Sequence, residues 1–223
     1  MTPPNAAPSS PAGDDRNLVP VDENYIAPSF EDRLALFWAK NSKSVLTVCV
    51  LVLLAVLAKG GYEIYTAKHE RDIAAAYAAA STDAQLKTFI AEHGTHQLAG
   101  VAQLHLADNA YASGHFADAQ SGYEKAAGVL GGTIFGQRAR LGSAVSLLQA
   151  GKPTEGEAAL KQLVGDLALI KGIRAEAAYM LAALATETGR SADSAKWAGQ
   201  VSAIDPSGQW MQRAAMLRAN QSE

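Results

Sequence analysis

The sequence predicts an all-α protein, in which a solenoid of helical hairpins follows one N-terminal transmembrane helix. Three observations lead to this fold class. A charge-free apolar run occupies residues 45–58, the chain beyond it is rich in Ala and Leu, and glycines recur at positions 114, 151 and 189, spaced 37 and 38 residues apart. Ala and Leu are strong helix formers, and a regular spacing of this length is typical of repeat proteins.

The composition limits the classes of function. The chain has 223 residues, of which 48% are hydrophobic, and a formal net charge of −3. That length can build one domain with its own core and a short appendage. The mild acidity argues against nucleic acid as a partner, because phosphate contacts require clustered Lys and Arg. The single cysteine, Cys49, lies in the apolar run, so cysteine usage fits either a cytosolic or an extracytoplasmic domain.

Residues 1–29 are predicted to be a disordered N-terminal tail. Six of the eight prolines lie there, and large apolar residues are few. Such a segment cannot bury enough surface to offset the entropy that it would lose on folding. Residues 30–43 follow as an amphipathic juxtamembrane segment.

Residues 44–65 are predicted to form a transmembrane helix and its flank. The apolar run, Val45–Ala58, would cover only about 21 Å as a helix, whereas the hydrocarbon core of a bilayer is roughly 30 Å thick. Long Lys side chains and aromatic rings at both ends can bridge the difference, because both favour the membrane interface. These flanking residues are Trp38 and Lys43 before the run and Lys59, Tyr62 and Tyr65 after it.

Three other interpretations of the run stay open: a buried core helix, a signal peptide cleaved after Ala58, and a re-entrant or interfacial segment. A run that is apolar on every face disfavours the first and the third. A signal peptide would need an unusually long region before its apolar core. The spanning anchor is therefore preferred. Its orientation is not decided by charge, because three basic residues lie on each side within about fifteen residues.

Residues 67–223 are predicted to form the repeat domain. Each unit has a small residue in a first helix, then a turn glycine, then a second amphipathic helix: Ala107 and Gly114, Ala144 and Gly151, Ala182 and Gly189. Small residues allow close helix approach, and a turn glycine can adopt a positive φ. The pattern resembles the tetratricopeptide repeat, so the expected fold is a tetratricopeptide-like helical-hairpin solenoid. Larger side chains are expected to fill the seams between hairpins: Tyr123, Leu160 and Val201.

Connections and end helices complete the predicted domain. Because the period exceeds the usual 34 residues by three or four, the extra residues are assigned to glycine-rich connections at 128–136 and 165–172. A helix pair at 67–80 and 83–93 precedes the repeats. An amphipathic helix at 209–220, which carries Trp210, is expected to cover the last apolar face of the solenoid.

No pattern typical of an active site is present, so the sequence does not predict an enzyme. Of the five histidines, His93 and His96 share a loop that has no neighbouring cysteine or carboxylate cluster, and a structural metal site needs four converging ligands. The pair Gly151-Lys152 lacks the first glycine and the Ser/Thr of a phosphate-binding loop. Triads assembled in space leave no local signature. No catalytic residue, metal or cofactor is therefore assigned.

The predicted binding surface is the concave face of the solenoid, which is lined by the first helix of each hairpin. Tyr and Arg are enriched at interaction hot spots, so Tyr111, Arg138 and Tyr179 are the leading candidates, with Asp108 and Leu141 beside them. Aliphatic residues on this face suit packing of the solenoid equally well. The repeat register directs eight residues to the face: Leu104, Asp108, Tyr111, Arg138, Leu141, Val145, Tyr179 and Ala183.

The order of the segments is a further signal. An acidic tail enters the short stretch Phe30–Lys43, a single span follows, and an Ala-rich helix at Ile73–Ala80 leads into the repeats. This order resembles the ancillary subunit of the SecYEG translocon in diderm bacteria, the YfgM-like proteins. The Pro-rich start and the glycines at 131–136 depart from the family's pattern.

The resemblance implies a single-pass protein of the cell inner membrane, with a cytoplasmic N-terminus and a periplasmic repeat domain. It implies four partners: the lipid bilayer, the SecYEG translocon, exported polypeptides, and a membrane-anchored periplasmic chaperone similar to a prolyl isomerase. The implied role is a scaffold that assists exported chains. Two other functions stay open: a structural tether that organises other envelope proteins, and a secreted repeat protein whose signal is cleaved.

Overall fold

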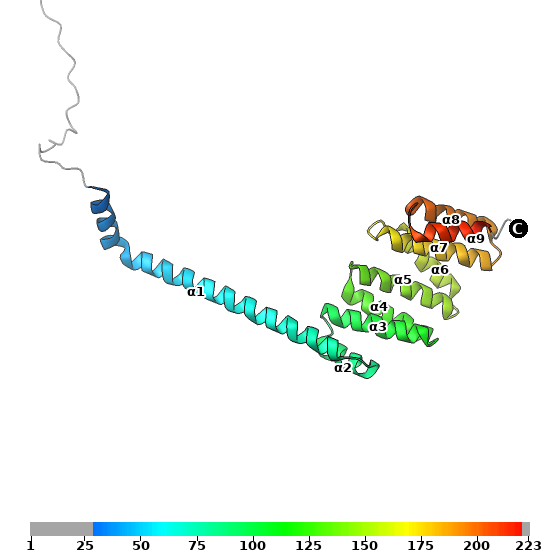
Figure 1. The fold of residues 1–223 in the computed structure, drawn as a ribbon, viewed down its shortest axis with the longest axis horizontal. Coiled ribbons are helices and arrows are strands. Elements are labelled where there is room, and N and C mark those ends of the chain that lie inside the picture. The colour runs from blue at the N-terminus through cyan, green and yellow to red at the C-terminus, as the bar shows by residue number, and fades with distance from the viewer. Residues whose placement is uncertain (1–28, 220–223) are drawn as a thin grey trace, which may run out of the picture. The chain divides into compact units, whose positions relative to one another are not determined.

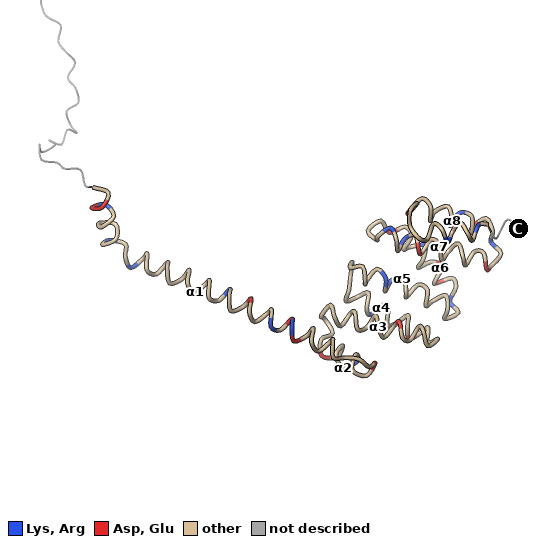
Figure 2. Tube along the Cα trace, in the orientation of Figure 1, with Lys and Arg blue, Asp and Glu red and all other residues tan. Residues whose placement is uncertain are grey.

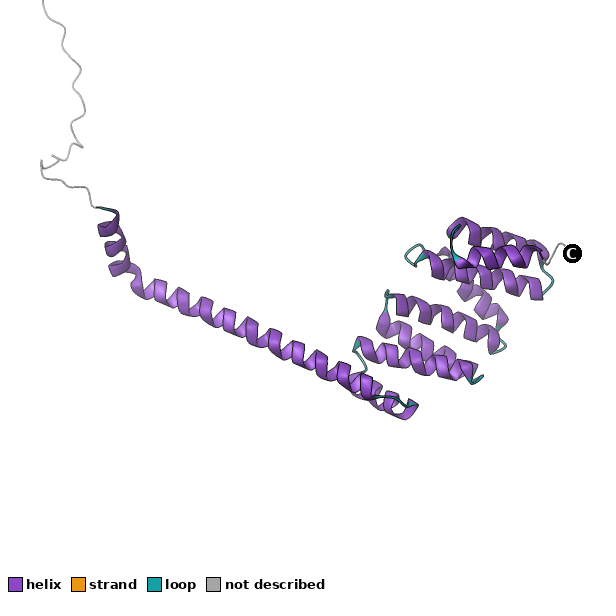
Figure 3. Ribbon diagram, in the orientation of Figure 1, coloured by secondary structure: helices purple, strands orange, loops and turns teal. Residues whose placement is uncertain are grey.

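The computed structural model describes residues 29–219, and within this range it contains nine helices and no strand (Figures 1 and 3). The expected tail at 1–29 lies outside the described residues, apart from Ser29. The all-α hairpin fold with one long apolar N-terminal helix is confirmed. The helices are α1 (Phe30–Ala79), α2 (Asp83–His93), α3 (Gln97–Ala112), α4 (Phe116–Leu130), α5 (Ile134–Gln149), α6 (Pro153–Gly165), α7 (Lys171–Glu187), α8 (Ser191–Ile204) and α9 (Gln209–Ala219).

The chain divides into two units, Met1–Glu63 and Ile64–Glu223, and each is described by itself. In the first unit, α1 begins at a reciprocal cap. The Asp32 N–H donates to the Ser29 hydroxyl at 3.2 Å, and the Ser29 N–H donates to the Asp32 carboxylate at 3.0 Å. This exchange satisfies amides that a helix start leaves without partners.

Among the described helices, α1 alone is long and apolar enough to cross a membrane or to act as a signal anchor. Figure 2 shows a stretch of α1 without charged residues. The large apolar side chains of that stretch, from Leu46 to Leu57, are exposed, so the run is not a buried core helix. The length and hydropathy of this run fit a membrane span or a signal anchor.

The helix α1 continues without a break into the second unit, so the entry helix expected at 67–80 is the end of α1. There Ile73 is buried against Leu86 and Phe89 of α2, and the rings of Tyr77 and Phe89 lie 5.6 Å apart. A capping box starts α2, because Thr82 accepts from the Gln85 N–H and the Gln85 side chain accepts from the Thr82 N–H.

Three hairpins follow, formed by α3 and α4, α5 and α6, and α7 and α8. Their turn glycines, Gly114, Gly151 and Gly189, have φ values of 77°, 76° and 69°, which confirms the predicted positive φ. In the first turn the Gly114 N–H donates to the Tyr111 carbonyl and the His115 N–H to the Ala110 carbonyl. Equivalent pairs close the other two turns. Each first helix therefore ends in a Schellman motif.

The connections between hairpins are shorter than the sequence predicted. They span residues 131–133 and 166–170, because Gly128, Gly136 and Gly165 lie inside helices and Gly172 lies in α7. The prediction of long glycine-rich connections was therefore wrong. Gly136 has a packing role instead, since a Cβ there would collide with the backbone of Gly131. The extra residues of the period lengthen the helices.

Small residues lie between the two helices of one hairpin, and larger residues lie between neighbouring hairpins. A Cβ on Gly122 would lie 2.9 Å from the Cβ of Ala107, so α3 and α4 approach as closely as side chains allow. The predicted seam residues Tyr123, Leu160 and Val201 are all buried. At the C-terminal end, α9 places Trp210 against α7, which covers the apolar face of the last hairpin.

Candidate protein-binding site

The first helices of the three hairpins enclose a cavity of about 360 Å³, to which α4 contributes one wall. Leu141, Val145 and Met180 supply apolar surface, and Tyr111 and Tyr123 supply aromatic surface. Charged groups also line the cavity: Asp108, Arg138 and Glu176. We call this space the inner cavity.

A hydrogen bond between two helices shapes the inner cavity. The Tyr123 hydroxyl on α4 donates to Asp108 Oδ1 on α3 over 2.6 Å. Burial raises the pKa of the Tyr123 hydroxyl, and the bond to Asp108 raises it further, so the hydroxyl stays protonated and donating. The ring reaches this position because Gly142 on α5 has no side chain. A Cβ there would lie 2.8 Å from the ring carbons.

The charges in the inner cavity differ in their surroundings. Arg138 is exposed, whereas Glu176 is half-buried. Burial raises the pKa of Glu176, and the positive charges of Arg138 and Arg213 act in the opposite direction. A cation at the surface and a half-buried carboxylate can each pair with an opposite charge on a bound chain.

The inner cavity combines apolar, aromatic and charged side chains. The lining contains no histidine, cysteine or serine, and its polar groups are two carboxylates, one guanidinium and two phenols. An apolar floor, aromatic walls and a few charges are the usual make-up of a site that holds a partner's side chain.

The structure brings together five of the residues that the sequence directed to the concave face: Asp108, Tyr111, Arg138, Leu141 and Val145. The other three lie outside the cavity lining. Leu104 belongs to the core between α3 and α4. The ring of Tyr179 lies against Trp210 of α9 in a tilted arrangement, with ring centroids 5.2 Å apart, and Ala183 is half-buried on α7.

Sequence reasoning missed four lining residues: Tyr123, Gly142, Glu176 and Met180. Tyr123 had been assigned to a seam between hairpins, and it reaches the cavity through that seam. A glycine in the middle of a helix, such as Gly142, often marks the close approach of a neighbouring group, and this signal was available. Glu176 is a single acidic residue in an Ala-rich stretch of α7, so no local motif marks it as a site residue.

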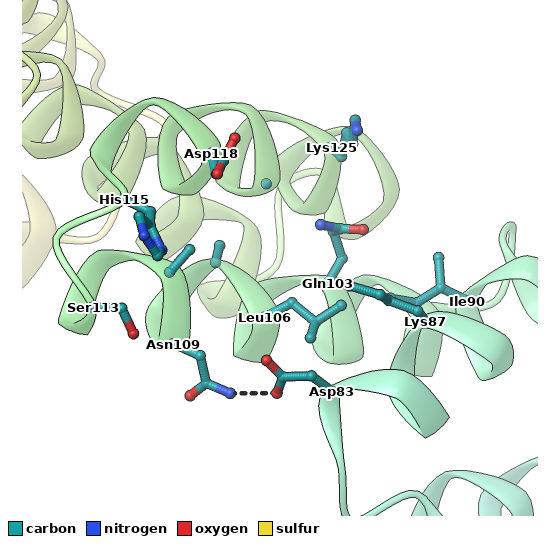
Figure 4. A pocket seen from close by; sticks show the side chains of 13 residues that line it. Asp83, Lys87, Ile90, Gln103, Leu106, Asn109, Ser113, His115, Asp118 and Lys125 are labelled. Carbon is teal, nitrogen blue, oxygen red and sulfur yellow. Dashed lines mark hydrogen bonds between the residues drawn. The ribbon is translucent and has the colours of Figure 1, made fainter.

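A larger space of about 580 Å³ lies between α2 and α4, over α3 (Figure 4). The Asn109 amide crosses its floor and donates to Asp83 Oδ1 at 2.9 Å. At about 100° per residue, Asn109 and Ser113 point to the side of α3 opposite Asp108 and Tyr111, so this outer groove and the inner cavity occupy different faces.

The outer groove is large because its side chains are small. One repeat later, the equivalent space between α4 and α6 has about 240 Å³. At a spacing of 37 residues, Ala110 corresponds to the buried Leu147, and Gly122 corresponds to Ala159. The second hairpin therefore fills with side chains the volume that the first leaves open.

The described residues contain no group of three or more His, Cys, Asp or Glu side chains placed to hold a metal ion. His96, which lies near His93 in the sequence, caps α3. Its Nδ1 accepts from the Leu98 N–H at 3.1 Å, so its Nε2 carries the proton that faces Glu70 Oε2 at 3.0 Å. Both ring nitrogens therefore have protein partners.

A comparison with family models finds one match, to the family described as tetratricopeptide repeat-like domain, over residues 36–162. The matched region runs from the first part of α1 through most of α6 and covers more than half of the chain. Comparisons with curated proteins and with solved structures give no match.

Proposed function

Because the chain belongs to the tetratricopeptide repeat-like domain family, we propose that it is a membrane-anchored scaffold that binds other proteins in its inner cavity. The observation that carries this proposal is the convergence of Tyr111, Arg138 and Glu176 on an apolar floor shared by three hairpins. Helical repeats of this kind bind extended peptides or partner helices on the face that their first helices line.

In the proposed binding mode, a segment of the partner crosses α3, α5 and α7. One apolar side chain enters the cavity above Leu141 and Val145. An acidic group of the partner pairs with Arg138 at the surface, and a basic group pairs with Glu176 deeper inside. Pairing with a cation would bring the pKa of Glu176 down again, so binding and ionisation support each other.

The proposed organisation follows the order of the segments. Residues 1–29 form a tail, 30–43 a juxtamembrane segment, 44–65 the membrane anchor, and 67–223 the binding domain with its capping helix. The resemblance to ancillary translocon subunits supports a cytoplasmic N-terminus and a periplasmic repeat domain in the cell inner membrane. It supports the SecYEG translocon, a membrane-anchored periplasmic chaperone similar to a prolyl isomerase, and exported polypeptides as partners.

A photocrosslinking residue in place of Tyr111, in the full chain in cells, tests the proposal. We expect protein adducts from Tyr111 and few from Lys152, an exposed position at the second hairpin turn. The substitution Arg138→Glu should reduce the adducts at Tyr111 by reversing the charge at the cavity. Adducts with lipid and solvent alone, or an equal yield at both positions, would contradict binding in the inner cavity.

Two further measurements test location and partners. Protease added to spheroplasts should degrade the repeat domain if it is periplasmic, and full protection would overturn that location. Identification of the adducts from Tyr111 should yield channel subunits, exported chains or the chaperone.

The outer groove favours a second candidate function, a structural tether, because a second hollow on another face could hold a second protein at the same time. Crosslinks from Lys87 and Lys125 in the outer groove to envelope-assembly factors, without recovery of the translocon, would support the tether instead.

A further inference from the structure

After α1, the large apolar side chains exposed on the described residues concentrate at two connections between hairpins. Exposed fractions are 36% for Val129, 64% for Ile134, 54% for Phe135, 80% for Leu167 and 43% for Ile170. Only Met216 on α9 adds to this set within residues 80–219. We call the five residues at the connections the apolar edge. Clustering of this kind marks an interaction surface, whereas single exposed apolar residues are ordinary.

The two connections are tied to each other. Gln137 is buried, with only 6% of the residue exposed. Its amide nitrogen donates to the Gly132 carbonyl at 3.0 Å, and its amide oxygen accepts from the Ile170 N–H at 2.9 Å. Arg140 adds a salt bridge to Asp166 at 3.0 Å. These bonds hold the two connections next to each other; Ile134 and Phe135 follow the first connection, and Leu167 and Ile170 belong to the second.

Charge is sparse on this surface. Residues 126–137 contain no charged side chain, and residues 162–170 contain only Asp166, which Arg140 engages. The exposed apolar groups are aliphatic apart from Phe135. The inner cavity has the opposite composition. Aliphatic and Phe side chains without carboxylates are what the interface of a bilayer accepts.

We propose that the apolar edge rests on the lipid bilayer, with Phe135 and Leu167 inserted at the boundary between headgroups and acyl chains. The inference rests on the proposed anchor, because one helix, α1, carries both the apolar run that ends at Ala58 and Ile73, its first residue buried in the repeat unit. A domain in the same chain as the anchor is held at high effective concentration near the surface, so a small apolar contact is enough to orient it. This orientation would fix how the inner cavity is presented to partners.

The test uses the full chain in vesicles of phosphatidylethanolamine and phosphatidylglycerol. In a Cys49→Ala background, which removes the only thiol, an environment-sensitive fluorophore is attached to Leu167→Cys or, separately, to Phe135→Cys. The matched control is Lys152→Cys, at an exposed hairpin turn. We expect blue-shifted emission and loss of fluorescence with acyl-chain quenchers at the two edge positions, and neither change at the control. Water-like emission without quenching at both edge positions would overturn the proposal.

A second variant separates lipid contact from other contacts. Ile134→Asp should abolish quenching of the label at Leu167→Cys while the far-ultraviolet circular dichroism is unchanged; persistent quenching would contradict the apolar edge as the cause. A blue shift that acyl-chain quenchers leave intact, and that disappears when labelled chains are diluted to one per vesicle, would mean contact between copies of the chain and would refute lipid contact.

Carbonate extraction distinguishes failure of the proposed lipid contact from failure of the proposed membrane anchor. A chain that resists extraction but shows no quenching retains the anchor and loses only the apolar edge. Release of the chain by carbonate would show that α1 does not anchor it, and the proposed lipid contact would then fail as well.

Discussion

Glu157→Gln tests how the second and third hairpins are joined. The Glu157 carboxylate on α6 accepts from both terminal nitrogens of Arg190, at 3.1 and 3.0 Å, and pairs with Lys161 at 2.7 Å. Arg190 precedes α8, so the interaction crosses from one hairpin to the next. The hydrogen bonds from Arg190 and Lys161 lower the pKa of Glu157 from 4.5 to about 2. The folded protein therefore binds this proton less readily than the unfolded chain does.

The sign and size of the effect follow from that pKa. A carboxyl whose pKa is lower in the folded state stabilises the fold above its unfolded pKa of 4.5, and this contribution disappears as the pH falls towards about 2. At about 1.4 kcal/mol for each pKa unit, the upper limit is about 3.4 kcal/mol. The Arg190 side chain is 38% exposed, so water weakens the pair. We therefore expect roughly 1–2 kcal/mol.

Urea unfolding of the full chain in detergent, followed by circular dichroism, measures this contribution. Glu157→Gln should lower the free energy of unfolding by roughly 1–2 kcal/mol at about pH 7, and at about pH 3 the difference should fall by more than half. Glu155→Gln, exposed in the first turn of the same helix, is the control and should cost less than about 0.5 kcal/mol. Equal losses for the two variants, or a loss at Glu157 that is independent of pH, would refute the reasoning.

Four further substitutions test single positions. Gly189→Ala should destabilise the domain by about 1 kcal/mol, because its φ is 69°. Gly199→Ala, in open space inside α8, should stabilise it by up to about 1 kcal/mol, so thermal melts of the two variants that shift in the same direction would contradict one of the two predictions. Gly142→Ala should cost about 1–3 kcal/mol by displacing the Tyr123 ring, seen as a lower urea midpoint. Tyr123→Phe should cost about 1–3 kcal/mol by leaving Asp108 without its donor, and an unchanged midpoint would show that water replaces the bond.

The sequence was sufficient for the hairpins because their turns depend on local chemistry. Gly114, Gly151 and Gly189 were identified by spacing, and each adopts the positive φ that the turn requires. The connections were misjudged because glycine has two roles. Gly136 is helical and makes room for the backbone of Gly131, and this contact between segments leaves no mark in the local sequence.

The inner cavity was predictable only in part, for a similar reason. Asp108, Tyr111 and Arg138 share a face because helical periodicity places them there. Tyr123 reaches the cavity from a second helix, next to Gly142, and the ring of Tyr179 packs instead against Trp210 of α9. Both positions depend on packing between helices, which cannot be predicted from the periodicity of a single helix.

The order in which the helices touch has a consequence for how this domain is made. From α2 to α9, every described helix packs mainly on the next helix along the chain or on the next but one. Loops between such partners are short, so little entropy is lost in closing them. When the chain emerges N-terminus first from a ribosome or a pore, the earlier helix on which each new helix packs has therefore already emerged. The solenoid can therefore fold from its N-terminal end, one hairpin at a time. No segment has to stay unpacked until a distant part of the chain emerges.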